Sequence, residues 1–275
     1  MSQAPPIDAF DVSDGSIWLP ATKEPARGSV LLFHGLTGHP SDLRDLAHAI
    51  HDTGFHVFVP RLSGHGRGLD VLKRTTAADW LRDAERFFSA LKKVTGQTPS
   101  LVGMSFGGLL ALHCAAVEQG RLPGLVVLSV PYVFRSLTRE ITMGVLARCP
   151  DAVLDRLWLV RKRSGTVIGA SGGPPAVTKH AVGAVARLVQ IRIRVRRAAN
   201  KITCPTLILQ GSDDHHLRVD AGIKLLRDLG SEAALVELYP HGIHKLTLGE
   251  HREQVTGRIV DFLRAGRTAS VSSEE

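Results

Sequence analysis

A serine held between two glycines is the first feature of the sequence that could carry chemistry. Ser105 stands in Gly103-Met104-Ser105-Phe106-Gly107, after a strand-like apolar run and before a helix-like one. A serine on so tight a strand-to-helix turn adopts a strained backbone, and its close neighbours must be small. Such a turn lifts the hydroxyl out of the sheet. Ser105 is therefore the candidate nucleophile of an acyl-transfer reaction.

A serine hydroxyl needs a base, and the base needs an acid that orients it. After a nucleophile turn of this kind, the acid comes first in the chain and the histidine second. Asp213 and Asp214 directly follow one predicted strand, and His241 and His244 follow the next. The carboxyl ends of parallel strands meet at one edge of a sheet, so all four side chains could approach Ser105. The residues alone leave both choices open.

The tetrahedral intermediate of acyl transfer carries a negative oxygen, which needs backbone N–H donors. The amide of Phe106 is one candidate, because it follows the nucleophile directly. The loop 34–38, which follows the first strong strand, is expected to supply the other. Its glycines, Gly35 and Gly38, would let the backbone fold towards Ser105.

These residues require a scaffold in which strands and helices alternate. Short apolar runs predict strands at 29–33, 55–60, 100–103, 125–130, 206–209 and 234–238. Helical spacing of apolar residues predicts helices at 42–52 with Ser41 as N-cap, 76–94, 107–118, 221–229 and 253–264. This alternation predicts a mostly parallel, doubly wound α/β sheet.

The alternation breaks once, between the fourth and fifth predicted strands. We therefore expect a core formed by residues 1–134 and 201–266, a helical insertion at 135–200, and a polar, disordered tail at 267–275. Within the insertion, residues 191–197 alternate apolar and basic side chains, as in a strand. The apolar stripe that precedes them continues at helical spacing, so we favour a helix.

The net charge of +8 is concentrated in this insertion. Residues 135–201 hold 14 Lys/Arg and 3 Asp/Glu, whereas the rest of the chain holds 20 and 23. The excess could attract an anionic substrate or contact an anionic membrane surface, but a solvated arginine face is the simplest interpretation. Aromatic residues make up only 5% of the chain and no nucleic-acid motif is present, so nucleic-acid binding is disfavoured.

Cysteine usage and apolar runs bear on the compartment. Cys114, Cys149 and Cys204 form neither a disulfide framework nor a zinc-ligand spacing, so we expect free buried thiols. No apolar leader opens the sequence, and no apolar run is long enough to span a bilayer. We therefore expect a cytoplasmic protein that needs no metal or cofactor.

Taken together, these motifs resemble the α/β-hydrolase superfamily, and within it bacterial carboxylesterases similar to monoacylglycerol lipases. The stretches that carry the resemblance are 30–38, 60–66, 79–80, 102–108, 205–214 and 242–248. The resemblance implies an α/β-hydrolase fold in which the insertion forms a helical cap over an acyl pocket. The chain departs from the family at Gly242-Ile243-His244, where relatives often have Ser-Gly-His.

The resemblance also assigns the site. It implies a triad of Ser105, Asp214 and His244, with the backbone amides of Leu36 and Phe106 as the oxyanion hole. It further implies structural roles for the histidines of two His-Gly pairs, which are His34 and His65.

The expected function is hydrolysis of carboxylic esters, with short- to medium-chain acyl groups or monoacylglycerols as small-molecule substrates. A thioesterase or carbon–carbon bond hydrolase with the same triad, or a slow-turnover receptor, remains an alternative. Dehalogenases and epoxide hydrolases are disfavoured, because they need an aspartate in place of Ser105. Several apolar residues of the insertion could line an acyl pocket or form core, namely Val145, Leu146, Leu154, Leu157, Trp158 and Leu159.

Overall fold

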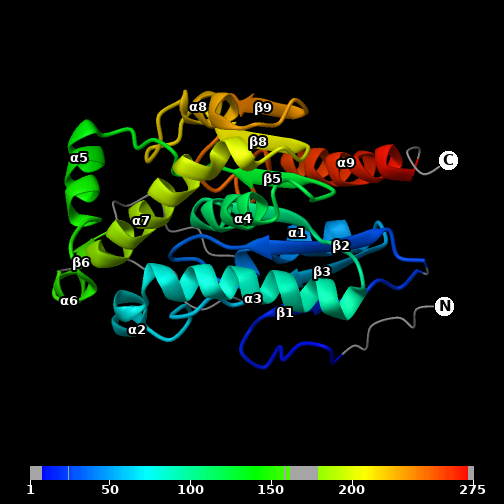
Figure 1. Cartoon of the computed structure of the whole chain (residues 1–275), viewed down its shortest axis with the longest axis horizontal. Coiled ribbons are helices and arrows are strands. Elements are labelled where there is room, and N and C mark those ends of the chain that lie inside the picture. The colour runs from blue at the N-terminus through cyan, green and yellow to red at the C-terminus, as the bar shows by residue number, and fades with distance from the viewer. Residues whose placement is uncertain (1–7, 24, 158, 162–178, 272–275) are drawn as a thin grey trace.

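A seven-stranded sheet forms the centre of the computed structural model (Figure 1). The structure describes residues 8–23, 25–157, 159–161 and 179–271. The strands of the sheet are β1 (Ile17–Leu19), β2 (Gly28–Phe33), β3 (Phe55–Val59), β4 (Ser100–Met104), β5 (Leu125–Leu128), β8 (Thr206–Gly211) and β9 (Ala234–Tyr239). Their order is β1-β3-β2-β4-β5-β8-β9, with β1 antiparallel to β3 and the other neighbours parallel. The predicted α/β fold with a mostly parallel, doubly wound sheet is confirmed.

Helices cover both faces of this sheet. They are η1 (Pro40–Leu43), α1 (Arg44–His51), α2 (Leu69–Arg74), α3 (Ala77–Thr95), α4 (Phe106–Val117), α5 (Leu137–Leu146), α6 (Asp151–Leu154), α7 (Val182–Ala198), η2 (Ala199–Lys201), α8 (Ala221–Asp228) and α9 (Arg252–Val271). Alternate residues of β2 enter separate cores: Val30 and Leu32 pack with α1 and α9, while Leu31 and Phe33 pack with α3 and α4. Burial on both faces explains why the central strands are mainly apolar.

The insertion leaves the sheet after β5 and returns at β8, which are neighbouring strands. It contains α5, α6, a two-stranded antiparallel sheet of β6 (Leu159–Arg161) and β7 (Lys179–Ala181), and α7. The run 191–197 lies within α7, so the predicted helix is confirmed. Figure 1 shows α7 running diagonally from the region of α6 towards β8 at one end of the sheet, and its buried residues pack on α4.

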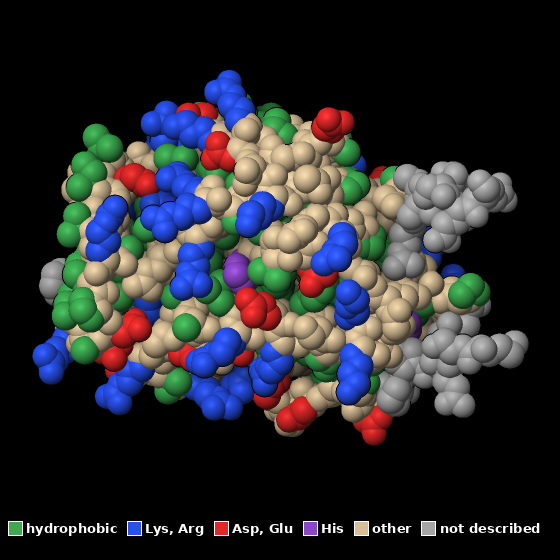
Figure 2. Space-filling view, viewed as in Figure 1, with side chains coloured by type: hydrophobic (Ala, Val, Ile, Leu, Met, Phe, Trp, Pro, Cys, Tyr) green, Lys and Arg blue, Asp and Glu red, His purple; other side chains and the backbone are tan. Residues whose placement is uncertain are grey.

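Two arginines of α7 lie inside the insertion rather than on its surface. The buried side chain of Arg187 donates from Nε to Asp151 (2.7 Å) and from Nη2 to Asp155 (2.6 Å). The buried Arg192 donates from both Nη atoms to the two oxygens of Glu140, at 3.0 and 2.6 Å. The expectation of a solvated arginine face is therefore wrong for these two residues. Figure 2 shows other Lys and Arg side chains scattered over the face of the molecule that is seen in Figure 1, with acidic side chains between them.

Several local predictions were wrong, each for a physical reason. Ser41 is not the N-cap: a 3-10 turn begins at Pro40, and the His39 ring accepts the Ser41 N–H as its cap. Helix α9 continues to Val271, into the predicted tail 267–275, while residues 272–275 lie outside the described part. The short edge strand β1 and the strands β6 and β7 were not predicted, because three residues give too little alternation to recognise.

The cysteines are free, as expected, but they are not all buried. Cys114 and Cys204 are buried, whereas Cys149 is partly exposed on the insertion. Burial raises the pKa of Cys204 to about 11 and raises that of Cys114 further. These two thiols therefore stay protonated at neutral pH and act as small apolar side chains.

Candidate active site

Ser105 occupies the sharp turn that its sequence setting predicts. It follows β4 directly and precedes α4, with φ 54° and ψ −116°. Its N–H donates to the carbonyl of Leu128 on the neighbouring strand β5, at 2.7 Å. A non-glycine residue in such a conformation costs about 1–3 kcal/mol, and the surrounding backbone must impose it.

The two flanking glycines are required by close backbone contacts. A Cβ on Gly103 would lie 2.3 Å from the carbonyl oxygen of Gly107. A Cβ on Gly107 would lie 2.0 Å from the carbonyl oxygen of Phe33 in β2. Any larger residue at either position would push α4 away from the sheet, so the turn can hold Ser105 only between glycines.

A chain of hydrogen bonds connects Ser105 to two residues from later loops. His244 Nε2 lies 2.8 Å from Ser105 Oγ, and His244 Nδ1 lies 2.6 Å from Asp214 Oδ2. Asp214 directly follows β8, and His244 follows β9, the next strand in the sheet. The parallel order of the strands therefore brings together residues 139 positions apart in the chain.

Asp214 is held as a buried carboxylate. Its Oδ1 accepts the backbone N–H groups of His216 (2.7 Å) and Leu217 (3.1 Å), while Oδ2 faces His244. Burial alone would raise the pKa of Asp214. The charge of His244 and the hydrogen bonds from His244 and from the His216 amide outweigh burial and lower it. The ionised acid can thus fix the His244 ring and stabilise its protonated form.

The other candidate pair lies at the surface, away from Ser105. Asp213 and His241 face each other at 3.4 Å, and both side chains are exposed. Asp213 also accepts from the hydroxyl of its neighbour Ser212. The structure thus brings Asp214 and His244 together with Ser105 and leaves Asp213 and His241 outside this group.

The loop after β2 lies against Ser105. A Cβ built on Gly35 would be 3.8 Å from Ser105 Cβ. The carbonyl of Gly35 accepts the Gly38 N–H at 2.9 Å and faces His34 Nδ1 at 3.0 Å. In a trans peptide the N–H points opposite to the C=O, so the Leu36 N–H is directed away from these partners. The Phe106 N–H, at the first position of α4, has no partner within its own helix.

Two buried histidines fix this loop from behind. His34 donates to Gly35 O and accepts the Leu62 N–H at 3.3 Å, and His65 Nε2 lies 2.7 Å from Leu36 O. Burial and the neighbouring His65 lower the pKa of His34, and burial lowers that of His65, so both rings are neutral. The structural role implied for both residues agrees with these contacts.

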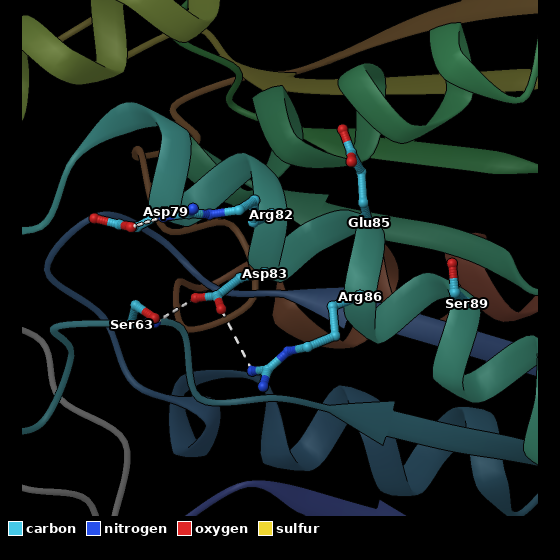
Figure 3. A pocket seen from close by; sticks show the side chains of 7 residues that line it. All are labelled: Ser63, Asp79, Arg82, Asp83, Glu85, Arg86 and Ser89. Carbon is cyan, nitrogen blue, oxygen red and sulfur yellow. Dashed lines mark hydrogen bonds and ion pairs between the residues drawn. The ribbon is translucent and has the colours of Figure 1, made fainter.

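A layer of polar contacts lies behind His65. Trp80 Nε1 donates to Ser63 O at 3.0 Å, and His65 Nδ1 lies 3.1 Å from the same oxygen. Because Trp80 already supplies a proton there, the single proton of the neutral His65 ring can serve Leu36. Asp83 in turn accepts the Ser63 N–H at 2.7 Å. Figure 3 shows Ser63, Asp83 and Arg86 at a surface hollow beside α3, where Arg86 Nη2 lies 3.4 Å from Asp83 Oδ1.

The insertion begins beside the acid loop, a contact that sequence reasoning missed. Phe134 forms a β-bridge with Leu217, and the Arg135 N–H donates to the carbonyl of His216 at 2.9 Å. The ring of His216 packs edge-on against that of His244, with centroids 5.0 Å apart. The only signal in the sequence was the position of His216 two residues after Asp214.

A second contact missed by sequence reasoning connects the histidine loop to the loop after β2. Lys245 Nζ lies 3.1 Å from Oδ2 of the buried Asp42. Asp42 belongs to η1, which follows Gly38. This ion pair holds the segment after His244 against the loop that presents the Leu36 amide.

The apolar residues proposed for an acyl pocket have different environments. Leu154 is fully buried beneath α7, whereas Val145 is 60% exposed. Leu146 and Leu157 are half-buried. Trp158 lies outside the described residues, and so does the side chain of Leu159. Leu154 is thus part of the core, and Val145 does not line an enclosed pocket.

Two properties of the described residues bear on other classes of site. They contain no group of three or more His, Cys, Asp or Glu side chains placed to hold a metal ion. Within the same residues, every helix is too short or too polar to cross a bilayer.

Comparison with known proteins places these residues in a wider context. The Hydrolase_4 family model, described as serine aminopeptidase S33, matches residues 24–252. The chain is 26% identical to a thermostable monoacylglycerol lipase of Bacillus sp. (strain H-257), over 85% of this chain and 89% of that protein. It is 22% identical to a carboxylesterase of Bacillus subtilis (strain 168), over 86% and 92%. A solved structure from work on LipS and LipT, two metagenome-derived lipolytic enzymes, superposes with a TM-score of 0.77 and 25% identity, covering 91% of this chain and 97% of that one.

Proposed function

Because the chain belongs to the Hydrolase_4 family of α/β-hydrolases, described as serine aminopeptidase S33, we propose that it hydrolyses carboxylic esters through Ser105, His244 and Asp214. The observation that carries the proposal is the continuous hydrogen-bonded chain from Ser105 Oγ through His244 to Asp214, at 2.8 and 2.6 Å. This is the connectivity that a serine nucleophile, its base and an orienting acid require.

The geometry supports the following reaction. His244 Nε2 takes the hydroxyl proton as Ser105 Oγ attacks the acyl carbon, and Asp214 stabilises the resulting imidazolium. The N–H groups of Leu36 and Phe106 donate to the oxyanion. His244 then protonates the leaving alcohol, and the acyl group remains on Ser105. Water, deprotonated by His244, attacks the acyl-enzyme and releases the acid.

The substrate class rests on relatives. Proteins similar over most of this chain are named monoacylglycerol lipase and carboxylesterase, which supports short- to medium-chain acyl esters or monoacylglycerols. A series of p-nitrophenyl esters of increasing acyl length, with the matching monoacylglycerols, tests this part. An aminoacyl p-nitroanilide tests the peptidase activity in the family description. We expect turnover of the esters and little of the anilide.

The variant Ser105→Ala tests the mechanism directly. We expect kcat for p-nitrophenyl butyrate to fall on the order of 10⁶-fold, because the nucleophile itself is removed. A fluorophosphonate probe should label the native protein promptly and leave the variant unlabelled. Ser89→Ala, which alters an exposed serine of α3, should retain both the rate and the labelling. Full activity in the Ser105 variant would exclude the proposed mechanism.

A further inference from the structure

One arginine of the insertion differs from the others in its position and its partners. Arg139 lies in the first turn of α5, where its N–H donates to Ser136 Oγ, the helix cap. Its guanidinium packs over the ring of Phe134, 4.9 Å from the centroid, and Nη1 lies 3.4 Å from Nδ1 of His216. The side chain therefore reaches from the insertion to the loop that carries Asp214.

Arg139 has no carboxylate partner among the residues that the structure describes. The acid next to it, Glu140, is already engaged: it binds Arg192 with both oxygens and accepts the Phe134 N–H at 3.0 Å. Arg187, by contrast, is paired with two aspartates. Burial lowers the pKa of Arg139, and no attraction by an acid offsets that effect.

The N-terminal end of α5 adds to the uncompensated positive charge at Arg139. The first turn of a helix carries a partial positive charge, so a cation there is disfavoured. Arg139 occupies that turn of α5 and is half-buried. A guanidinium retains several N–H donors after one contact with His216. The site thus combines unused donors with a positive charge that no carboxylate of the described part of the chain neutralises.

The position of this charge relative to the reaction is defined by His244. Because His244 protonates the leaving oxygen, the alcohol half of an ester must lie on the His244 side of Ser105. The His216 ring packs against His244 there, and Arg139 contacts His216. Groups carried by the alcohol half therefore extend towards Arg139, whereas the oxyanion lies towards Leu36.

We propose that Arg139, supported by His216 and Phe134, binds a carboxylate or phosphate group on the alcohol half of the ester substrate. This inference rests on the proposed esterase function and narrows its substrate class. A guanidinium matches both groups through paired N–H donors. The Arg139 Nη1 donation to His216 Nδ1 also assigns the proton of the neutral His216 ring to Nε2.

Two pairs of esters separate charge from shape. The first is 3-(butyryloxy)propanoate and its neutral carboxamide; the second is 1-butyrylglycerol 3-phosphate and 1-butyrylglycerol. In Arg139→Gln, we expect kcat/KM for the anionic member to fall about tenfold or more, as a charged hydrogen bond is lost. The neutral member should change by less than about twofold. The pair with the larger effect identifies carboxylate or phosphate as the preferred group.

Two further variants complete the test. Arg194→Gln removes the same charge from an exposed position on α7. For both pairs of esters, it should leave the ratio of kcat/KM between the anionic and the neutral member unchanged. Arg139→Lys keeps the charge and should retain part of the preference. Melting temperatures and the neutral-ester rates report whether each variant is folded. Equal losses for anionic and neutral esters in Arg139→Gln would overturn the proposal.

Binding separates this inference from the proposed function. In the Ser105→Ala background, which leaves the ester intact, calorimetry should detect tighter binding of the propanoate than of the carboxamide. That difference should disappear when Arg139→Gln is added. If the native protein hydrolyses no ester, the proposed function fails while this binding test still stands. If esters are hydrolysed but neither rate nor binding prefers the anion, only the Arg139 assignment fails.

Discussion

Two aspartate–histidine pairs occupy the same two loops and have very different surroundings. Asp214 and His244 lie 2.6 Å apart, with 1% and 21% of their side chains exposed. Asp213 and His241 lie 3.4 Å apart, with 53% and 83% exposed. The residue types are the same, and the members of each type are at most three positions apart. Burial and contact with Ser105, rather than residue type, separate a candidate site from a surface contact.

The backbone of the two loops explains the difference. The strands β8 and β9 pair up to Gly211 and Tyr239, and the Asp213 N–H then donates to Gly242 O at 3.1 Å. A Cβ on Gly211 would lie 2.0 Å from Gly242 O, so the loops touch through glycine backbone. This contact directs Asp213 outwards and leaves Asp214 on the side of the sheet edge that faces Ser105.

The strongest test of this comparison replaces each of the two histidines in turn. We expect His244→Ala to lower kcat for p-nitrophenyl butyrate on the order of 10⁶-fold, because the general base and acid is lost. His241→Ala should leave kcat within about twofold, since an exposed pair contributes little. Steady-state rates of both variants, with melting temperatures as a check of folding, decide the matter. Comparable losses in the two variants would show that the pairs are not distinct.

The acids should show the same contrast with a smaller effect. Asp214→Asn keeps the shape but removes the charge that orients and stabilises His244, so we expect a loss in kcat of about 10⁴-fold. Asp213→Asn is the matched control and should retain the native rate. If Asp213→Asn proved the more damaging of the two, the acid assignment would move to the surface pair.

Much of this arrangement could be predicted from sequence. Five of the six predicted strands are buried along their whole length, and this made them visible as short, mainly apolar runs such as 29–33. The nucleophile turn was visible because Gly103 and Gly107 meet opposing backbone at distances that exclude a Cβ. The three-residue strands were not visible, because each depends on a partner strand elsewhere in the chain. The 3-10 turn at Pro40 was missed because its cap is the ring of His39 rather than a serine side chain.

The choice within the site was harder. Residue types alone left both aspartates and both histidines open. Neighbouring loop residues can point in opposite directions, and which of them faces Ser105 depends on a backbone conformation that residue types do not reveal. Family resemblance selected one of each. Neither source could indicate Arg139 or His216, because they are 77 residues apart and meet only when the insertion packs on the acid loop.

A third histidine, His216, extends the comparison to the pH dependence of stability. Burial, followed by the charge of His244, lowers the pKa of His216 from 6.5 to about 4, although Asp214 opposes the shift. An unfolded chain would protonate this ring near pH 6.5, whereas the folded protein resists until about pH 4. The unfolded state therefore binds more protons in this window, and stability must fall as pH drops from 6.5 to 4.

His216→Gln should remove this contribution. Urea unfolding at a series of pH values should give a shallower loss of unfolding free energy for this variant between pH 6.5 and 4. The difference in slope should stay below about 1.4 kcal/mol per pH unit, the limit for one proton, because the ring is partly solvated. The buried His34 and His65, whose pKa values are also lowered, contribute to the pH dependence of the unfolding free energy in the native protein and in the variant alike. His241→Gln should follow the native curve, and an unchanged slope in His216→Gln would place His216 with the exposed His241 rather than with the buried site.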